Sequence, residues 1–478
     1  MIVLSAQSVI ATTVPTQPTQ MSREQLVALF QKELGDKFDP AQTDALLSAH
    51  QMLEDFFDKP TERKQITAAI EATNIDPNIL GKLARVRATW QPFEPGSYYI
   101  NERVGPFMVK YFVGVPKNYD PAKSWPLLIK LPASDQFART PKPTADEVTV
   151  AYQHWIDDEI AAHPDQLVIM PLLNLDEFYG PSYAGMHTVI QPMYHASERF
   201  NIDPSRVYML GHSMSAHATW NIALMYPTYF AAFAPLAGGA SAEYQRVRII
   251  ALRNVLPVVW HDSDDKVIAV DAARRIVNAL KAQKVEVSFD QTKGIGHVPL
   301  DSVIERVYSK LKNRARDLYP KRVSLQSNRP DTIFNRNDWL QIYQPMNAGD
   351  EHRLIFSKGR GFMVTYANTF KADATIAKNK IEVTADNVAF LRLYFNDQMI
   401  DFSQPVTVSV NRKVRFEGKL TPSADVMLKD QLFLGRGWRY YTAFVDLDLA
   451  ATTRPATRPA TTRATTRPTT TRPAANRP

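Results

Sequence analysis

A serine flanked by small residues stands in the stretch RVYMLGHSMSAHATW, which runs from residue 206 to residue 220. A serine hydroxyl attacks a carbonyl carbon only where it is exposed and where a base can take its proton. Gly211 and Ser215, two positions on either side of Ser213, leave room for a sharp strand-to-helix turn, in which neighbouring backbones crowd the serine. Ser213 is therefore the candidate nucleophile, and the chemistry would be acyl transfer.

An acid-rich stretch and a loop histidine follow the serine along the chain. The stretch WHDSDDKV comes directly after the apolar run LPVVW, and KGIGHVPLD, which contains His297, comes after the run VEVSFD. A nucleophilic serine needs a base, and the base needs a carboxylate to fix its tautomer. Both stretches follow strand-like runs, and open α/β sheets gather their sites at the carboxyl ends of strands. The spacing therefore indicates that a serine, an acid and a histidine meet at one edge of a sheet.

Short apolar runs alternate with helical segments from residue 98 to about residue 318. The runs are FMVKYFVGV, PLLIKL, QLVIMPLL, RVYML, FAAFAPLA, LPVVW and VEVSFD, and the segments between them are TVIQPMYHASERF, AHATWNIALMY, AVDAARRIVNALKA and VPLDSVIERVYSKLK. This alternation is typical of a mostly parallel sheet that helices cover on both faces.

These stretches resemble the α/β-hydrolase superfamily. The resemblance is carried by YFVGVPKNYDPAKSWPLLIKL, RFNIDPSRVYMLGHSMSAHATW, PVVWHDSDDKVIAVDAARRIVNALKA and GIGH, which cover somewhat under half of the chain. The sequence is most similar to bacterial esterases of the polyhydroxybutyrate-depolymerase, feruloyl-esterase and dienelactone-hydrolase kind and to prolyl-oligopeptidase-like catalytic domains. The resemblance implies a triad in the chain order serine, acid, histidine.

Carried over residue by residue, the resemblance implies that Ser213 is the nucleophile, Asp265 the acid and His297 the base. Asp265 occupies the acid position of a His-Gly-x-x-Asp-x-x-Val pattern that these families share. Asp264 is the alternative acid.

The chain departs from the family pattern within the acid stretch. Asp262 stands where the pattern has glycine, and Ile268 stands where it has valine. The second exchange is conservative, whereas the first changes the turn. We expect the substrate pocket around residues 135–152 and 174–185, because loops at this edge form the pocket walls in this fold.

The oxyanion of an acyl-transfer intermediate needs backbone N–H donors. The resemblance implies that Met214, which follows the nucleophile, supplies one of them. The second donor normally comes from a His-Gly motif, but this chain reads LPASDQ there, and Pro132 has no N–H to give. Ser134 is the candidate for the second donor, and Ala133 is the alternative.

Different patterns flank the predicted catalytic domain, which we place at residues 98–320. Residues 22–97 read as a small helical module: SREQLVALFQKEL puts apolar residues on one face behind Ser22 as N-cap. From 323 to 449 period-two strands predict an all-β domain, in which Val406, Val408 and Val410 share one face. We interpret this domain as a structural or oligomerisation sandwich, with carbohydrate binding as the alternative. The predicted fold class is thus α/β, with a helical module before the hydrolase domain and an all-β domain after it.

The two ends of the chain differ in composition from the rest. Residues 1–21 are either an export signal or a disordered N-terminus. Residues 450–478 repeat Thr, Arg and Pro and lack large apolar residues, which predicts a disordered tail. The tail holds six Arg and no acid, so of the net charge of +7 only about +1 remains for the rest. The tail could contact acidic envelope polymers.

Charge and composition exclude some classes of protein. A nearly neutral folded part without a basic stripe argues against a nucleic-acid partner. No Cys is present, so disulfides and thiolate sites are excluded. No apolar stretch is long enough to cross a bilayer. The histidines show no metal-ligand spacing, and the chemistry needs no cofactor. We expect an extracellular or periplasmic location, with the cytoplasm as the alternative.

The predicted function is that of a serine hydrolase, carboxylesterase-like, which cleaves a small-molecule or polymer-linked ester through an acyl-enzyme. One alternative is a prolyl-oligopeptidase-like serine peptidase that uses the same triad on an amide. The other is a non-catalytic protein of the same fold that binds envelope components or polymers. The sequence leaves open the acyl and leaving groups, the preference between ester and amide, the role of the β domain and the oligomeric state.

Overall fold

The computed structural model describes residues 19–87, 89–90, 93–104, 107–132, 144–172, 183–240, 247–355 and 362–450. Residues 1–18 and the Thr/Arg/Pro tail after residue 450 lie outside these ranges, so the interpretations of both ends stay predictions.

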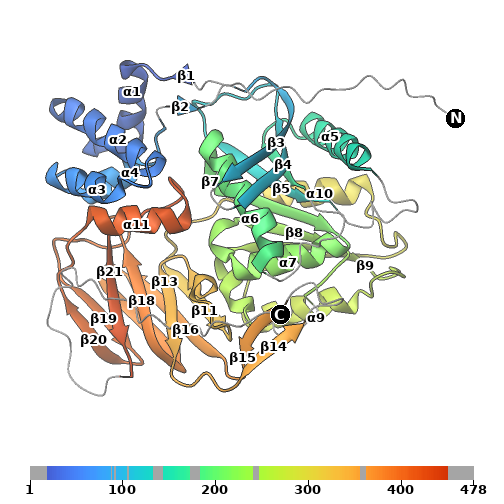
Figure 1. Ribbon diagram of the computed structural model, residues 1–478. Coiled ribbons are helices and arrows are strands. Elements are labelled where there is room, and N and C mark those ends of the chain that lie inside the picture. Colours follow the sequence, from blue (N-terminus) through green and yellow to red (C-terminus); the bar gives the residue numbers. More distant parts are fainter. Residues whose placement is uncertain are drawn as a thin grey trace, which may run out of the picture.

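An eight-stranded sheet forms the centre of the molecule (Figure 1). Its strand order is β10-β9-β8-β7-β5-β6-β4-β3, and β4 runs antiparallel to both of its neighbours. The other neighbouring pairs are parallel. The strands are β3 Gly96–Val104, β4 Phe107–Val115, β5 Trp125–Leu131, β6 Leu167–Pro171, β7 Ile202–His212, β8 Ala232–Leu236, β9 Leu256–Asp262 and β10 Ser288–Thr292. The predicted hydrolase sheet is thereby confirmed.

Helices cover both faces of this sheet, as predicted (Figure 1). On one face α5 and α10 pack against alternate strand residues such as Leu128 and Val168. On the other face α6, α7 and α9 pack against the intervening ones, such as Leu127 and Ile129. The helices are α5 Ala145–Ala162, α6 Tyr183–Arg199, α7 Met214–Met225, α9 Asp271–Ala282 and α10 Asp301–Lys312. Burial on both faces explains why the strands read as continuous apolar runs.

Within the described residues, the N-terminal part contains four α-helices, α1 Arg23–Leu34, α2 Thr43–Asp58, α3 Arg63–Ala72 and α4 Pro77–Leu83, with two short 3-10 helices, Gly35–Lys37 and Pro40–Gln42, between α1 and α2. Ser22 caps α1 as predicted, and Gln25 completes a capping box with it. Phe30 and Leu34 are buried, whereas Leu26 and Leu29 are partly buried against the same cluster. The short strands β1 Thr19–Gln20 and β2 Thr89–Trp90 pair with each other beside these helices.

Two packed sheets form most of the C-terminal part. One has the order β11-β16-β17-β19-β20 and the other the order β12-β13-β18-β21. Val406, Val408 and Val410 are buried and point to the same face, which confirms the predicted alternation. The strands are β11 Arg322–Ser327, β12 Arg336–Asn337, β13 Leu340–Pro345, β16 Phe370–Ala377, β17 Lys380–Asp386, β18 Val388–Phe395, β19 Val406–Val410, β20 Lys413–Gly418 and β21 Ala443–Asp448, with the separate hairpin β14 Glu351–Ile355 and β15 Phe362–Tyr366.

One helix, α11 Ala424–Leu434, interrupts the C-terminal strands, so the part predicted as all-β is not purely β. Ser423 caps it, and Ala424, Met427 and Leu428 join the buried cluster of the N-terminal helices. In Figure 1 α11 lies between these helices and the C-terminal sheets. The helix forms here because its apolar residues are buried against another part of the chain.

The segment from residue 435 to residue 442, called the junction segment here, contacts all three parts of the molecule. Trp438 packs edge-on against Tyr229 and donates a hydrogen bond from its indole nitrogen to Ser197 Oγ on α6, 3.2 Å away. Arg439 donates to the backbone carbonyl of Leu318 at 2.9 Å. The junction segment therefore fixes the C-terminal sheets against the part of the molecule that contains the eight-stranded sheet.

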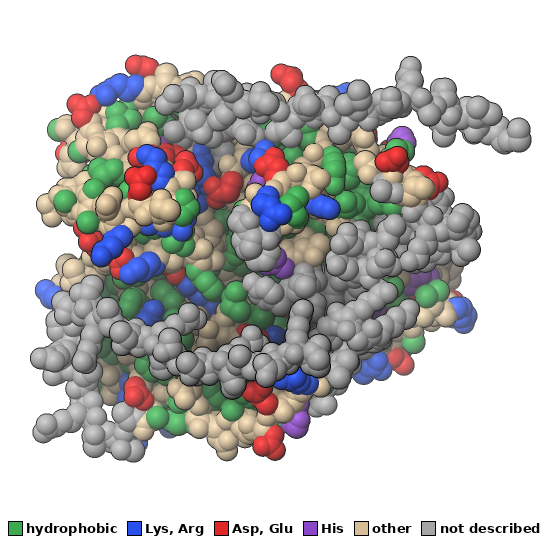
Figure 2. Space-filling view, in the orientation of Figure 1, with side chains coloured by type: hydrophobic (Ala, Val, Ile, Leu, Met, Phe, Trp, Pro, Cys, Tyr) green, Lys and Arg blue, Asp and Glu red, His purple; other side chains and the backbone are tan. Residues whose placement is uncertain are grey.

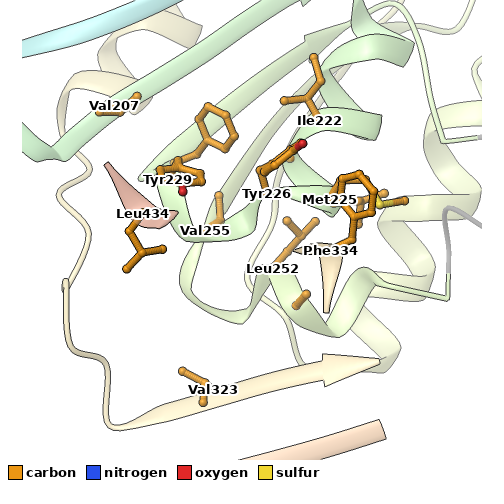
Figure 3. Close-up of a cluster of buried hydrophobic side chains, with 14 of the residues drawn as sticks. Val207, Ile222, Met225, Tyr226, Tyr229, Leu252, Val255, Val323, Phe334 and Leu434 are labelled. Atoms are coloured by element: carbon orange, nitrogen blue, oxygen red, sulfur yellow. The ribbon is translucent and has the colours of Figure 1, made fainter. Parts of the chain in front are cut away.

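The buried core also continues between these parts. Figure 3 draws Val323, Phe334 and Leu434 of the C-terminal part in one view with Tyr226 and Leu252 of the part that contains the eight-stranded sheet. All belong to one cluster of buried side chains. Separating the two parts would expose this apolar surface to water.

The surface in Figure 2 shows Lys and Arg side chains interspersed with Asp and Glu rather than gathered in one stripe. Among the described helices, none combines the length and the apolar composition that a bilayer crossing requires.

A buried ion pair joins the N-terminal helices to the junction segment. Arg436 donates two hydrogen bonds to the carboxylate of Glu54 on α2, at 2.8 and 2.5 Å. Burial raises the pKa of Glu54, but the hydrogen bonds and charge of Arg436 outweigh burial and lower it to about 2.

Replacing Glu54 by Gln is expected to lower the free energy of unfolding at pH 7 by about 3 kcal/mol, because the buried guanidinium of Arg436 loses its counter-charge. A carboxylate with a lowered pKa stabilises the fold above its ordinary pKa of 4.5, and this contribution is lost as the pH falls toward 2. Denaturant unfolding between pH 7 and pH 2 checks this, with exposed Glu71→Gln as control. Parallel stability curves for wild type and Glu54→Gln would contradict it.

Candidate active site

Ser213 occupies a strained turn between β7 and α7. Its backbone has φ +58° and ψ −121°, a conformation that non-glycine residues rarely adopt. The turn is held from both sides: Ser213 N–H donates to the carbonyl of Leu236 at 2.9 Å, and its own carbonyl accepts from Ala216 N–H at 3.0 Å. Such a turn lifts the side chain away from the backbone at the carboxyl end of the strand.

The two small residues around Ser213, Gly211 and Ser215, suit their positions for different physical reasons. A Cβ atom on Gly211 would lie 2.4 Å from the carbonyl oxygen of Ser215 and 2.5 Å from Thr219 Oγ1, so only glycine fits there. Ser215, which replaces the usual glycine of the pattern, is buried and donates from Oγ to the carbonyl of Pro132 at 2.6 Å. This hydrogen bond ties the start of α7 to the chain that leaves β5.

The structure brings the three residues predicted for the triad together. Ser213 Oγ lies 2.9 Å from His297 Nε2, and His297 Nδ1 lies 2.8 Å from Asp265 Oδ2. They follow β7, β10 and β9 respectively, which run parallel in the sheet. Ser213 keeps 6% of its surface exposed, and the side chain of His297 keeps 13%. Both residues therefore keep a small part of their surface exposed.

The carboxylate of Asp265 is fully buried and fixed by several donors. Its Oδ1 accepts the backbone N–H groups of Val267 at 2.8 Å and Ile268 at 3.0 Å, while Oδ2 faces His297. Burial raises the pKa of Asp265, but the hydrogen bonds from His297 and from the two amides outweigh burial and lower it. The group stays ionised and accepts the Nδ1–H of His297. The described side-chain contacts of His297 do not include Asp264, the alternative acid.

Asp262, the departure from the family glycine, joins the loop after β9 (residues 263–270, the acid loop) to the loop after β10 (residues 293–300, the histidine loop). Its Oδ2 accepts from Thr292 Oγ1 at 2.7 Å and from Ile295 N–H at 3.1 Å, and its Oδ1 accepts from Asp264 N–H at 2.8 Å. Burial raises its pKa, but these bonds and one from the Gly296 amide outweigh burial and lower the pKa to about 2. The sequence flagged the exchange but not this role, because nothing in it placed Asp262 beside the histidine loop.

Three further histidines surround the triad without contacting the hydroxyl of Ser213. His212 Nε2 lies 2.8 Å from the backbone carbonyl of His297 and so helps to fix the histidine loop. His261 Nε2 lies 2.8 Å from the carbonyl of Ile268 and 3.2 Å from Asp265 Oδ2. His217 Nδ1 lies 2.5 Å from the carbonyl of Gly239. Their positions indicate that these histidines hold the neighbouring backbone in place and do not exchange a proton with Ser213.

Of the residues predicted to supply the oxyanion donors, only Met214 lies among the described residues. Met214 is the first residue of α7, so its N–H stands at a helix N-terminus beside Ser213. Ala133 and Ser134 lie outside the described residues, as do 135–143 and 174–182 of the expected pocket loops. No group of three or more His, Asp or Glu side chains in the described ranges is placed to hold a metal ion.

Comparison with known proteins gives matches only among solved structures. No family model matches the sequence, and no curated protein matches it. A thermostable esterase matches at 18% identity and TM-score 0.38, over 46% of this chain and 63% of that chain. A dipeptidyl aminopeptidase IV candidate from Bacteroides ovatus matches at 14% identity and TM-score 0.38, over 48% of this chain and 38% of that chain.

A ferulic acid esterase matches at 16% identity and TM-score 0.33, over 45% of this chain and 95% of that chain. The chain spans less than two thirds of the thermostable esterase and of the dipeptidyl aminopeptidase IV candidate. Because identities and TM-scores are low, the α/β-hydrolase fold is assigned from the strand order and the strained turn of this chain itself.

Proposed function

We propose that this protein is a serine hydrolase that cleaves carboxylic esters through an acyl-enzyme. The observation that carries the proposal is the continuous contact from Ser213 Oγ through the His297 ring to the buried Asp265 carboxylate, on a strained turn. A hydroxyl, an imidazole and a carboxylate in this order are the parts that nucleophilic acyl transfer requires.

In the first half-reaction His297 Nε2 takes the proton of Ser213 while Oγ attacks the ester carbonyl. Asp265 holds the Nδ1–H of the ring, which keeps the lone pair of Nε2 toward the serine and stabilises the imidazolium that forms. His297 then gives the proton to the departing alcohol oxygen, and the acyl group stays on Ser213. In the second half-reaction water attacks this acyl group, with His297 again as base.

The negative charge on the carbonyl oxygen needs donors at the turn. Met214 N–H is the proposed first donor, because it follows the nucleophile and begins α7. Ser134, or Ala133 in its place, is the proposed second donor. The bond from Ser215 to the carbonyl of Pro132 supports this assignment, because it holds the chain next to Ala133 against the start of α7.

Labelling with a fluorophosphonate tests the proposal, since this reagent forms a stable bond with an activated serine. We expect one phosphonyl group for each chain, found by mass spectrometry on Ser213 and not on Ser215, whose hydroxyl donates to the carbonyl of Pro132. Heat-denatured protein should take up none, because the contact with His297 is lost. A folded protein that stays unlabelled, or that carries the label on another residue, would contradict the proposal.

A further inference from the structure

The most exposed large apolar side chains stand close to the candidate triad residues in the sequence. In the described part of the chain, the three most exposed large apolar side chains are Val267 at 69%, Val298 at 66% and Leu300 at 56%. Each lies within three positions of Asp265 or His297 along the sequence. Single exposed apolar residues are common on protein surfaces, but three of them in the two loops that carry the candidate acid and histidine point to a binding surface.

The backbone that carries these side chains is fixed by the site itself. Val267 N–H donates to Oδ1 of Asp265 at 2.8 Å. Val298 follows His297, whose carbonyl lies 2.8 Å from His212 Nε2. The carbonyl of Leu300 accepts the first hydrogen bonds of α10, from Val303 and Ile304. The three apolar groups are therefore carried by backbone that is hydrogen-bonded to the candidate triad residues, to His212 or to the start of α10.

The mechanism indicates which part of an ester would reach them. His297 Nε2 must deliver its proton to the alcohol oxygen, so the alcohol leaves on the side of the histidine. The acyl carbonyl points instead toward the proposed oxyanion donors near Met214. Val298 and Leu300 belong to the histidine loop, and Val267 belongs to the acid loop that contacts it. The alcohol part thus faces these loops.

We propose that Val267, Val298 and Leu300 form an apolar rim that binds the alcohol part of the substrate, so that esters of long-chain apolar alcohols are preferred. This inference rests on the proposed function. In the reaction the bond between carbonyl carbon and alcohol oxygen breaks, the bond to Ser213 Oγ forms, and the alcohol leaves neutral with the proton from His297. The rim takes no part in making or breaking these bonds. It removes apolar surface of the alcohol from water.

The test compares two series of esters: acetates of ethanol, butanol and octanol, and ethyl esters of acetic, butyric and octanoic acid. We expect wild-type kcat/KM to rise with the length of the alcohol. In Val298→Ser/Leu300→Ser the octyl-to-ethyl ratio of kcat/KM should fall about tenfold, mainly through KM, because contact with buried methylene groups is lost. The ratio for the acyl series should stay as in wild type, which a merely structural defect would not achieve.

Val414→Ser is the matched control, because Val414 is 49% exposed on β20 of the C-terminal part. It should keep the wild-type octyl-to-ethyl ratio. An unchanged ratio in the double variant, or a wild type without preference for long alcohols, would overturn the rim while Ser213 still reacts with the fluorophosphonate. A protein that neither reacts with that reagent nor cleaves any ester would overturn the proposed function and the rim with it.

Discussion

Ser213→Ala is expected to lower kcat for ester hydrolysis by about 10⁴-fold or more, because no other described hydroxyl lies within hydrogen-bond distance of His297 Nε2. Alanine keeps the backbone of the turn, and the bonds from Ser213 N–H and to its carbonyl do not involve the side chain. Substrate binding should therefore persist, so KM should change far less than kcat. Steady-state kinetics at saturating substrate measures this difference.

The control for this variant is Ser302→Ala, an exposed serine in the first turn of α10. It should retain wild-type kcat. The melting temperature of Ser213→Ala should equal or exceed that of wild type, which separates a lost nucleophile from a lost fold. If Ser213→Ala hydrolysed esters at more than a tenth of the wild-type rate, the nucleophile would have to be sought elsewhere.

Asp265→Asn is expected to lower kcat about 10⁴-fold. The carboxylate accepts the Nδ1–H of His297, whereas an amide that offers its NH₂ group there would hold the other tautomer and place a proton on Nε2. A protonated Nε2 cannot take the proton of Ser213. The amide should also fit the site sterically. We therefore expect only a small fall in melting temperature beside the large loss of kcat.

Asp264→Asn is the matched control, one position away in the same loop. We expect less than a twofold change in kcat, because the carboxylate of Asp264 is not among the contacts of His297. If this variant lost activity and Asp265→Asn kept it, the assignment of the acid would be reversed. In that case the pH dependence of kcat should be altered by replacing the residue whose carboxylate contacts the ring.

The sequence was most informative where one pattern determines both burial and conformation. The run FMVKYFVGV corresponds to β4, and the valines of β19 alternate as predicted, because the strand period places them on one buried face. The strained turn at Ser213 was also predictable, since glycine at position 211 avoids the backbone of the following helix. The triad residues, predicted by resemblance, lie in contact in the structure, while their catalytic roles stay a proposal.

Other features depend on contacts that no local pattern encodes. Helix α5 was not among the predicted segments, because Val148, Tyr152 and Ile156 form only a narrow apolar stripe, which packs against the sheet. Helix α11 was missed because it lies within a region of strong strand periodicity and is buried by distant residues. The role of Asp262 depends on amides of another loop, 33 positions away at Ile295.

The junction segment has a consequence for how the protein is made. Arg436 is 382 positions after its partner Glu54, so the ribosome completes the eight-stranded sheet and its helices before this ion pair can form. Until the C-terminal strands are made, the apolar surface that includes Tyr226 and Leu252 is not buried by the C-terminal sheets. During synthesis the nascent chain is therefore expected to expose this apolar surface until the last strands are made, and exposed apolar surface of this kind favours association with other chains.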